Sequence, residues 1–135
     1  MAARASKTEQ AEHDLVVEKS ADTYRATRGV AYTNPGSEKN HGVAGLYPDV
    51  VAKKADGSIV IEEVETASTV TEDECEKQWK PYSKLGHKFN LIVPIDSVGL
   101  AQRFIRRSQL QVTLQAYTIS GNNVKFYDSQ GNPIT

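Results

Sequence analysis

The chain has 135 residues, with 16 basic and 17 acidic side chains and a hydrophobic share of 39%, which is typical of one globular domain. Its single cysteine, Cys75, excludes an internal disulfide, and no apolar run approaches the roughly 20 residues of a membrane span. The first residues lack the apolar core of a signal peptide, so we expect a cytoplasmic protein that does not bind membranes. The net charge of −1 argues against a protein that coats nucleic acid by bulk electrostatics.

This near-zero charge hides a division along the chain. Residues 1–61 carry eight acids and eight bases, whereas residues 62–76 carry seven acids and no base. Residues 77–135 then carry eight bases and two acids. A helix that begins with acids and ends with bases is favoured by its dipole and is one explanation. It does not account for the acids that precede the helix, Glu62, Glu63 and Glu65.

In the first part of the chain, the pattern predicts a helix, a short strand and a loop. The helix is expected from Lys7 to about Arg25, and the strand over Val30–Thr33. The segment 34–42 is rich in turn-forming residues, which indicates a surface loop.

Two β-rich runs follow and predict a hairpin. The first covers Tyr47–Lys53 and the second Ile59–Thr66, with Asp56-Gly57 between them as a typical tight turn. Pairing about that turn places Asp49 opposite residue 64.

The second half predicts two helices and three strands. Thr71 and Glu74 form a capping box that begins a helix, Gly86 ends it, and Pro81 should bend or break it. The later elements are a strand over Lys88–Pro94, a helix from Asp96 or Ser97 to about Gln109, and a hairpin of Leu110–Ser120 with Val124–Tyr127. This order, α-β-β-β-α-β-α-β-β, indicates a single domain over residues 1–135 of the α/β or α+β sandwich class.

Acidic side chains gather at one end of the predicted hairpin. Alternation along the second strand puts Ile59, Ile61, Glu63 and Glu65 on one face, so this strand begins in the core and ends with two carboxylates at the rim of a cleft. The hairpin brings Asp49 beside them. Oxygen ligands without His or Cys suit Mg²⁺ or Mn²⁺, which would offset the repulsion between the carboxylates. A solvated acidic edge strand is the alternative.

This arrangement of acids resembles a nuclease motif. Pro48-Asp49, followed across a hairpin by Glu63-Val64-Glu65, resembles the motif of the PD-(D/E)xK nuclease superfamily, with Glu65 at the position where lysine is usual. Gln78 and Tyr82, four residues apart on one helical face, resemble the QxxxY element of RecB-type members. The expected order of elements also resembles the αβββαβ core of the restriction endonuclease-like fold, a mixed sheet flanked by helices, over roughly residues 8–95.

The resemblance implies Mg²⁺-dependent hydrolysis of DNA phosphodiester bonds by an endonuclease or exonuclease. Asp49, Glu63 and the backbone carbonyl of Val64 would hold Mg²⁺ or Mn²⁺. Glu65 would accept a proton from the attacking water or hold a second ion.

The resemblance also implies a glutamate contributed by the first helix. Glu12 fits that place loosely, and Glu18 is its rival. Because lysine is absent at position 65, Lys80 and Lys84 are candidates for stabilising the charge of the transition state.

Basic residues after position 76 could form a phosphate-binding rim around the acids. They are Lys77, Lys80, Lys84, Lys88, Arg103, Arg106 and Arg107. A solvated basic helix face explains them equally well.

Five further residues stand out by their type. His41, in the predicted loop, could contact substrate or metal, but a solvated histidine is the simpler interpretation. His13 and His87 have no partner at metal-ligand spacing and receive no role. Cys75 is expected to be a buried structural residue, and Trp79 a core residue rather than a platform for stacked bases.

The expected function is therefore that of a small stand-alone Mg²⁺-dependent nuclease acting on DNA. Sequence specificity would come from a homodimer, from loops or from a protein partner. A second interpretation is a catalytically inactive domain of the same fold that binds nucleic acid or a protein. A third is a soluble binding module in which Asp49, Glu63 and Glu65 lie far apart or face solvent.

Overall fold

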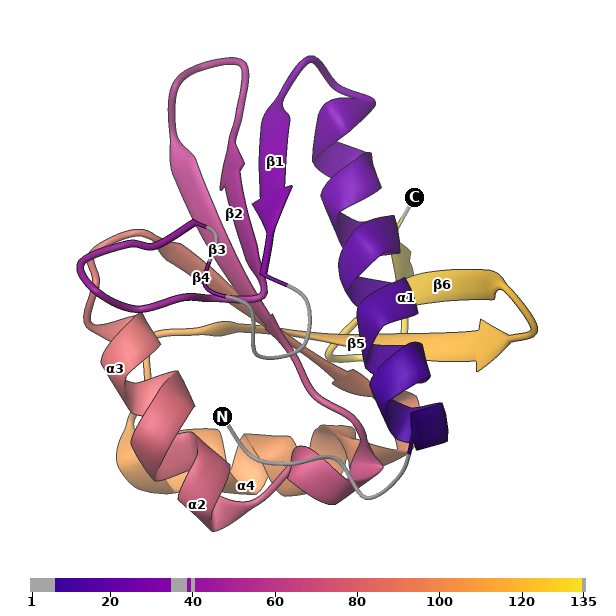
Figure 1. The fold of residues 1–135 in the computed structure, drawn as a ribbon. Helices are drawn as coiled ribbons and strands as arrows, with labels where there is room; N and C mark the ends of the chain where they lie inside the picture. Colours follow the sequence, from indigo (N-terminus) through magenta and orange to yellow (C-terminus); the bar gives the residue numbers. More distant parts are fainter. Residues whose placement is uncertain (1–6, 35–38, 40, 135) are drawn as a thin grey trace.

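The computed structural model describes residues 7–34, 39 and 41–134. It contains a seven-stranded sheet in which the strands lie side by side in chain order, β1 to β7 (Figure 1). The strands β1, β2 and β3 are antiparallel, β3, β4 and β5 are parallel, and β5, β6 and β7 are again antiparallel. The predicted mixed α/β architecture, with helices flanking a mixed sheet, is confirmed.

The first helix covers one face of the sheet. Helix α1 spans Lys7–Arg25 and strand β1 spans Val30–Thr33, both as predicted. The buried side of α1, which includes Val16, Val17 and Ala21, packs against apolar side chains of β1 to β5. The apolar spacing of i, i+1 and i+5 places these residues along one stripe of the helix, which explains why the helix lies along the sheet.

The central hairpin is shorter than the sequence suggested. Strand β2 spans Val50–Lys53 and strand β3 spans Ile59–Val64. Lys54 and Ser58 close the hairpin through a backbone hydrogen bond of 2.9 Å, so the loop has three residues instead of two. Gly57 ends this loop with φ of +89°, the left-handed backbone that such loops require at this position.

The longer loop shifts the strand register by one residue. Val50 lies opposite Glu62, which continues to Asp49 opposite Glu63 rather than residue 64. Asp49 is thereby directly beside a carboxylate of the next strand.

The helix after β3 contains a wide turn in its middle. It consists of α2 over Glu72–Glu74, a π-helical segment η2 over Cys75–Trp79, and α3 over Lys80–Ser83. Pro81 has no N–H to donate into a regular helix, and the π turn accommodates it. The predicted irregularity at Pro81 is thus confirmed.

The predicted start of this helix is also confirmed, but its end is not. The Thr71 hydroxyl accepts a hydrogen bond of 3.1 Å from the Glu74 N–H. The helix stops at Ser83, before Gly86, which adopts φ of +81° in the following turn. A short 3₁₀ turn, η1, spans Ala67–Thr69 just after β3.

The remaining elements follow the predicted order. They are β4 (Lys88–Pro94), the 3₁₀ turn η3 (Ile95–Ser97), α4 (Val98–Ser108), β5 (Thr113–Ser120), β6 (Asn123–Asp128) and β7 (Pro133–Ile134). Strand β5 begins three residues later than expected, and β7 was not expected.

A second apolar core lies on the other face of the sheet. Residues of the α2–α3 helix and of α4, including Trp79 and Ala101, pack there against Ile61 and Leu91 of the sheet. Figure 1 shows these helices grouped on the side away from α1. Among the described residues, no helix has the length and apolar character needed to cross a membrane.

Candidate metal centre

Three carboxylates meet where β3 ends. Glu63 lies in β3, Glu65 directly follows it, and Glu74 comes from α2, with one oxygen of each within 4.8 Å of the others. Two oxygens that bind one Mg²⁺ at about 2.1 Å lie at most about 4.2 Å apart. Small side-chain rotations would therefore bring all three oxygens to one cation.

These carboxylates are buried, which differs from the expected rim of a cleft. Glu63 is 2% exposed, Glu65 1% and Glu74 2%. The strand alternation was predicted correctly, but the α2–α3 helix covers the end of β3 and removes its acids from water. The interpretation as a solvated acidic strand is wrong for Glu63 and Glu65.

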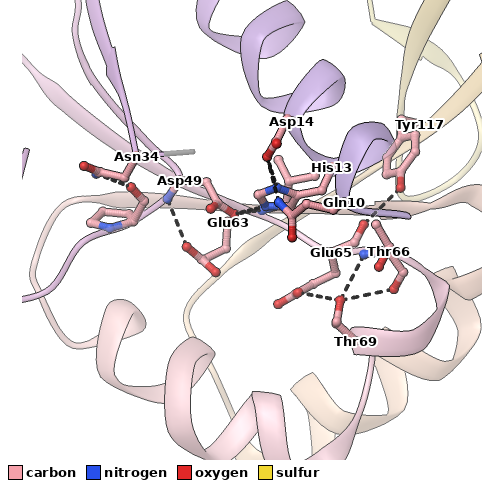
Figure 2. A network of polar contacts seen from close by, with 12 residues as sticks. Gln10, His13, Asp14, Asn34, Asp49, Glu63, Glu65, Thr66, Thr69 and Tyr117 are labelled. Carbon is pink, nitrogen blue, oxygen red and sulfur yellow. Dashed lines mark hydrogen bonds and ion pairs between the residues drawn. The ribbon is translucent and has the colours of Figure 1, made fainter. Parts of the chain in front are cut away.

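Asp49 joins the acids from the neighbouring strand, as predicted. Its N–H donates to Glu63 Oε1 at 3.0 Å (Figure 2). Its own Oδ2 accepts from the Val64 N–H at 2.8 Å. The Asp49 side chain is fully buried, and its Oδ1 has no hydrogen-bond partner in the described part of the chain. The predicted role of the Val64 carbonyl as a metal ligand stays a prediction.

Glu65 is held by two donors from different elements. The Trp79 indole Nε1 donates to Glu65 Oε2 at 2.7 Å, and the Thr69 hydroxyl donates to Oε1 at 2.8 Å. Trp79 is fully buried, so its predicted place in the core is confirmed. Its bond to Glu65 was not anticipated.

The environment favours the protonated form of two of these acids in the absence of a cation. Burial raises the pKa of Glu63 well above its usual range, and the nearby charges of Asp49 and Glu65 raise it further. Burial, followed by the charge of Glu74, raises the pKa of Glu65 to about 8. None of Asp49, Glu63 and Glu65 forms an ion pair with a Lys or Arg side chain within the described residues. The group must bind protons or a cation to be stable.

His13 is a member of this site that the sequence analysis left without a role. It is fully buried in α1, with Nε2 at 3.0 Å from Asp49 Oδ2 and Nδ1 at 2.9 Å from Asp14 Oδ1 (Figure 2). No sequence spacing links His13 to Asp49. The helical pattern held a signal, because His13 precedes Val16 and Val17 by three and four residues and so shares their buried side.

Glu74 was predicted only as part of a helix cap. Its place in the acidic run of residues 62–76 was the available signal, and the structure now divides that run. The exposed acids of the run form ion pairs with basic side chains: Glu72 with Arg107 at 3.4 Å, Asp73 with Lys77 at 3.2 Å, and Glu76 with Lys80 at 3.4 Å. The helix-surface explanation therefore holds for these three acids, and the other four are buried.

Gln78 and Tyr82, the two residues predicted to resemble a QxxxY element, differ in their surroundings. Tyr82 is buried, and its pKa is raised by burial and then by the charges of Glu63 and Asp49. Gln78 is half-buried in η2 and makes no side-chain hydrogen bond with the described residues. The predicted site roles of both residues stay predictions.

The structure distinguishes between the two candidate glutamates of α1. Glu12 is half-buried and accepts a hydrogen bond from the Tyr117 hydroxyl, which also lies 3.1 Å from the Glu65 carbonyl oxygen. It adjoins the carboxylate group without belonging to it. Glu18 is exposed and pairs with Arg25 at 2.7 Å, so it is not part of the site.

The predicted basic rim is only partly available. Lys77, Lys80 and Arg107 pair with exposed acids. Lys84, Arg103 and Arg106 are exposed. Lys88 lies at the opposite end of the sheet from the acids, where it lines a pocket of about 530 Å³. Of the two lysine candidates for charge stabilisation, Lys80 is engaged by Glu76.

The other residues singled out by type behave as structural or surface groups. Cys75 is buried, as predicted, and burial raises the pKa of its thiol. His41 is exposed and its ring stacks on Tyr32 at 4.3 Å between centroids, which agrees with a surface role. His87 is exposed at the pocket that Lys88 lines.

A further buried carboxylate lies on the opposite face of β3. Glu62 accepts hydrogen bonds from the Ser20 hydroxyl, from the Tyr24 hydroxyl at 2.7 Å, and from Asn90 Nδ2 at 2.9 Å. Its oxygens are well supplied with donors, which indicates a structural link between α1 and the sheet.

Comparison of the chain with protein-family models, with curated proteins and with solved structures gave no match. Four buried carboxylates, one histidine and few compensating positive charges among the described residues suit a hard divalent cation with oxygen ligands.

Proposed function

We propose that this protein is a Mg²⁺-dependent nuclease with a restriction endonuclease-like core. The observation that supports this most is the contact between Asp49 and Glu63, 3.0 Å from amide nitrogen to carboxylate oxygen, next to Glu65 and Glu74. It brings together the acids of the Pro48-Asp49 and Glu63-Val64-Glu65 motifs from two adjacent strands.

Each residue would have a separate task. Asp49, Glu63 and Glu74 would hold Mg²⁺ or Mn²⁺, which would polarise the phosphate and lower the pKa of a bound water. Glu65 would accept the proton of the attacking water once the bound cation favours its ionised form. Tyr82 would lie at the edge of this group, where its hydroxyl can donate to a phosphate oxygen.

DNA is the proposed substrate, and its phosphates would be bound by exposed basic residues. Lys84, Arg103 and Arg106 are exposed and stand on elements that pack on the same face of the sheet as the acids. A second copy of the chain or a protein partner would supply sequence specificity.

A second candidate is a catalytically inactive domain of the same fold that binds nucleic acid or a protein. The burial of the acids favours it, because Asp49, Glu63 and Glu65 are each at most 2% exposed and a phosphate must reach them. The engagement of Glu65 by Trp79 and Thr69, where a lysine would otherwise stand, favours it as well.

A cleavage assay separates the two candidates. We expect the protein to cleave single-stranded, duplex or branched DNA with Mg²⁺ or Mn²⁺, and Asp49→Asn and Glu63→Gln to lower the rate by at least about 100-fold, the typical loss of one electrostatic stabilising group. The matched control is Glu72→Gln, an exposed acid of the same run that should leave the rate unchanged. Absence of cleavage by the wild type on all three substrates with either ion would overturn the nuclease proposal.

A further inference from the structure

The side chain of Asp49 is oriented through one of its two oxygens. Oδ2 receives the Val64 N–H at 2.8 Å and lies 3.0 Å from His13 Nε2. Oδ1 is equally buried and has no hydrogen-bond partner among residues 7–34, 39 and 41–134. One oxygen is thus occupied by protein groups, and the other is left for a ligand.

His13 is itself held from its other side. Its Nδ1 lies 2.9 Å from Asp14 Oδ1, and the same oxygen accepts a hydrogen bond of 2.9 Å from Gln10 Nε2. Asp14 is 41% exposed at its side chain, whereas the side chains of His13 and Asp49 are 0% and 1% exposed. The imidazole is therefore fixed between a partly solvated carboxylate and a buried one.

The contact between His13 and Asp49 also connects two different parts of the fold. His13 belongs to α1, which packs on one face of the sheet, and Asp49 directly precedes β2. A buried histidine that needed only a hydrogen-bond partner could use Asp14 alone. Its contact is with Asp49 Oδ2, the oxygen that the Val64 N–H already binds, so both groups hold the Asp49 carboxylate at the same oxygen.

We propose that His13 is the positioning residue of the metal centre: with Asp14 behind it, it holds Asp49 by Oδ2 so that Oδ1 is the atom that binds the divalent cation. This inference rests on the proposed function, since it requires that the carboxylates bind a cation. Groups that orient a metal ligand in this way typically change metal affinity by about 10- to 100-fold when removed.

The test is a Mn²⁺ titration of the full chain, followed by the electron paramagnetic resonance signal of free Mn²⁺. We expect His13→Phe, which keeps the ring but removes both nitrogens, to weaken Mn²⁺ binding by about 10- to 100-fold. His13→Gln, whose amide nitrogen can take the place of Nε2 beside Asp49 Oδ2, should restore most of the affinity. Tyr24→Phe is the matched control, because it removes a different buried contact of α1, the one to Glu62, and should leave Mn²⁺ binding unchanged.

Asp14→Ala provides a second variant in case His13→Phe does not fold. It alters a partly exposed side chain and should weaken Mn²⁺ binding several-fold by releasing the imidazole, while Glu18→Ala, which removes the same charge from an exposed position of α1, should not. Unchanged Mn²⁺ affinity in folded His13→Phe, or in Asp14→Ala where the former does not fold, would overturn the role of His13 and leave the metal centre intact. Absence of Mn²⁺ binding by the wild type would instead overturn the metal centre itself, and the inference with it.

Discussion

Glu65 belongs to the candidate site and also contributes to the stability of the fold. Trp79 and Thr69 donate to its two oxygens. A buried carboxylate with a donor at each oxygen is held in a fixed orientation. Its neighbour Glu74 opposes its charged form.

Replacement of Trp79 tests how far Glu65 depends on its donors. Trp79→Phe keeps most of the packing but leaves Glu65 Oε2 without its donor, so we expect a loss of about 1–3 kcal/mol in the free energy of unfolding. Urea denaturation followed by circular dichroism measures it. An unchanged free energy of unfolding would show that the indole N–H contributes nothing to this pair.

The pKa values of the acids predict how stability depends on pH without metal. Glu65 titrates near pH 8 in the folded protein and near its ordinary value of 4.5 when unfolded, so the folded state holds the extra proton between these values. The contribution of Glu65 to the free energy of unfolding is therefore complete below about pH 4.5. It falls as pH rises toward 8, by roughly 1 kcal/mol per pH unit for one proton. Glu63 acts in the same direction.

Thermal unfolding in a chelator at pH 5.5, 7 and 8.5 measures this dependence. We expect the unfolding temperature to fall with pH, Glu65→Gln to reduce the fall, and saturating Mg²⁺ to offset it by replacing the protons. An unfolding temperature that rises over this range in the wild type would contradict the raised pKa values.

The sequence predicted some residues of the site and missed others for a definite reason. Asp49 and Glu63 were found because one hairpin determines their proximity, and hairpin pairing can be read from local pattern. His13 and Glu74 were missed because each reaches the acids through the docking of a helix on the sheet, which no local spacing specifies.

Among the elements, helix α1 is tied to the sheet by polar contacts as well as by its apolar side. Glu62 of β3 accepts hydrogen bonds from Ser20 and Tyr24 of α1, and His13 contacts Asp49. The contacts with Glu62 and the contact with Asp49 lie on different parts of the helix, and only the contact with Asp49 involves the candidate site.

Tyr24→Phe should destabilise the protein without affecting the metal centre. It leaves an oxygen of buried Glu62 with one donor fewer, so we expect the free energy of unfolding to fall by about 1–3 kcal/mol. Urea denaturation measures this change. Tyr32→Phe is the control, because Tyr32 is 45% exposed and its hydroxyl can bond to water instead. Equal stability of the two variants would show that the Glu62 network does not hold α1.

The hairpin loop can be tested with a pair of glycine variants. Gly57 has φ of +89°, so Gly57→Ala should cost about 1 kcal/mol of stability. Gly99 lies in α4 with open space at its Cβ position, so Gly99→Ala should instead stabilise the helix by up to about 1 kcal/mol. Chemical denaturation of both variants measures the difference, and a gain of stability in Gly57→Ala would contradict the assigned loop.

Some element boundaries could be read from the sequence, and others depend on long-range pairing. Strand β4 was predicted over its full length of Lys88–Pro94 because proline and a preceding glycine turn delimit its apolar run. The three-residue hairpin loop could not be distinguished from a two-residue turn at Asp56-Gly57, which caused the one-residue register error. Strand β7, Pro133–Ile134, is defined only by its pairing with β6.

At the scale of the whole molecule, the sheet and its two helical layers gather acidic side chains at one buried place. Parallel strands β3 and β4 are connected by the α2–α3 helix, which packs over the end of β3 and carries Glu74 to Glu63 and Glu65. The antiparallel hairpin brings Asp49 from the other side. The near-neutral total charge therefore conceals buried acids and exposed ion pairs.

The central claim is that these acids bind a divalent cation. The most direct test is a crystal of the protein soaked in Mn²⁺ and measured at the manganese absorption edge. We predict an anomalous peak about 2 Å from oxygens of Asp49, Glu63 and Glu74. Full soaking that leaves no such peak at these oxygens would contradict a cation site here.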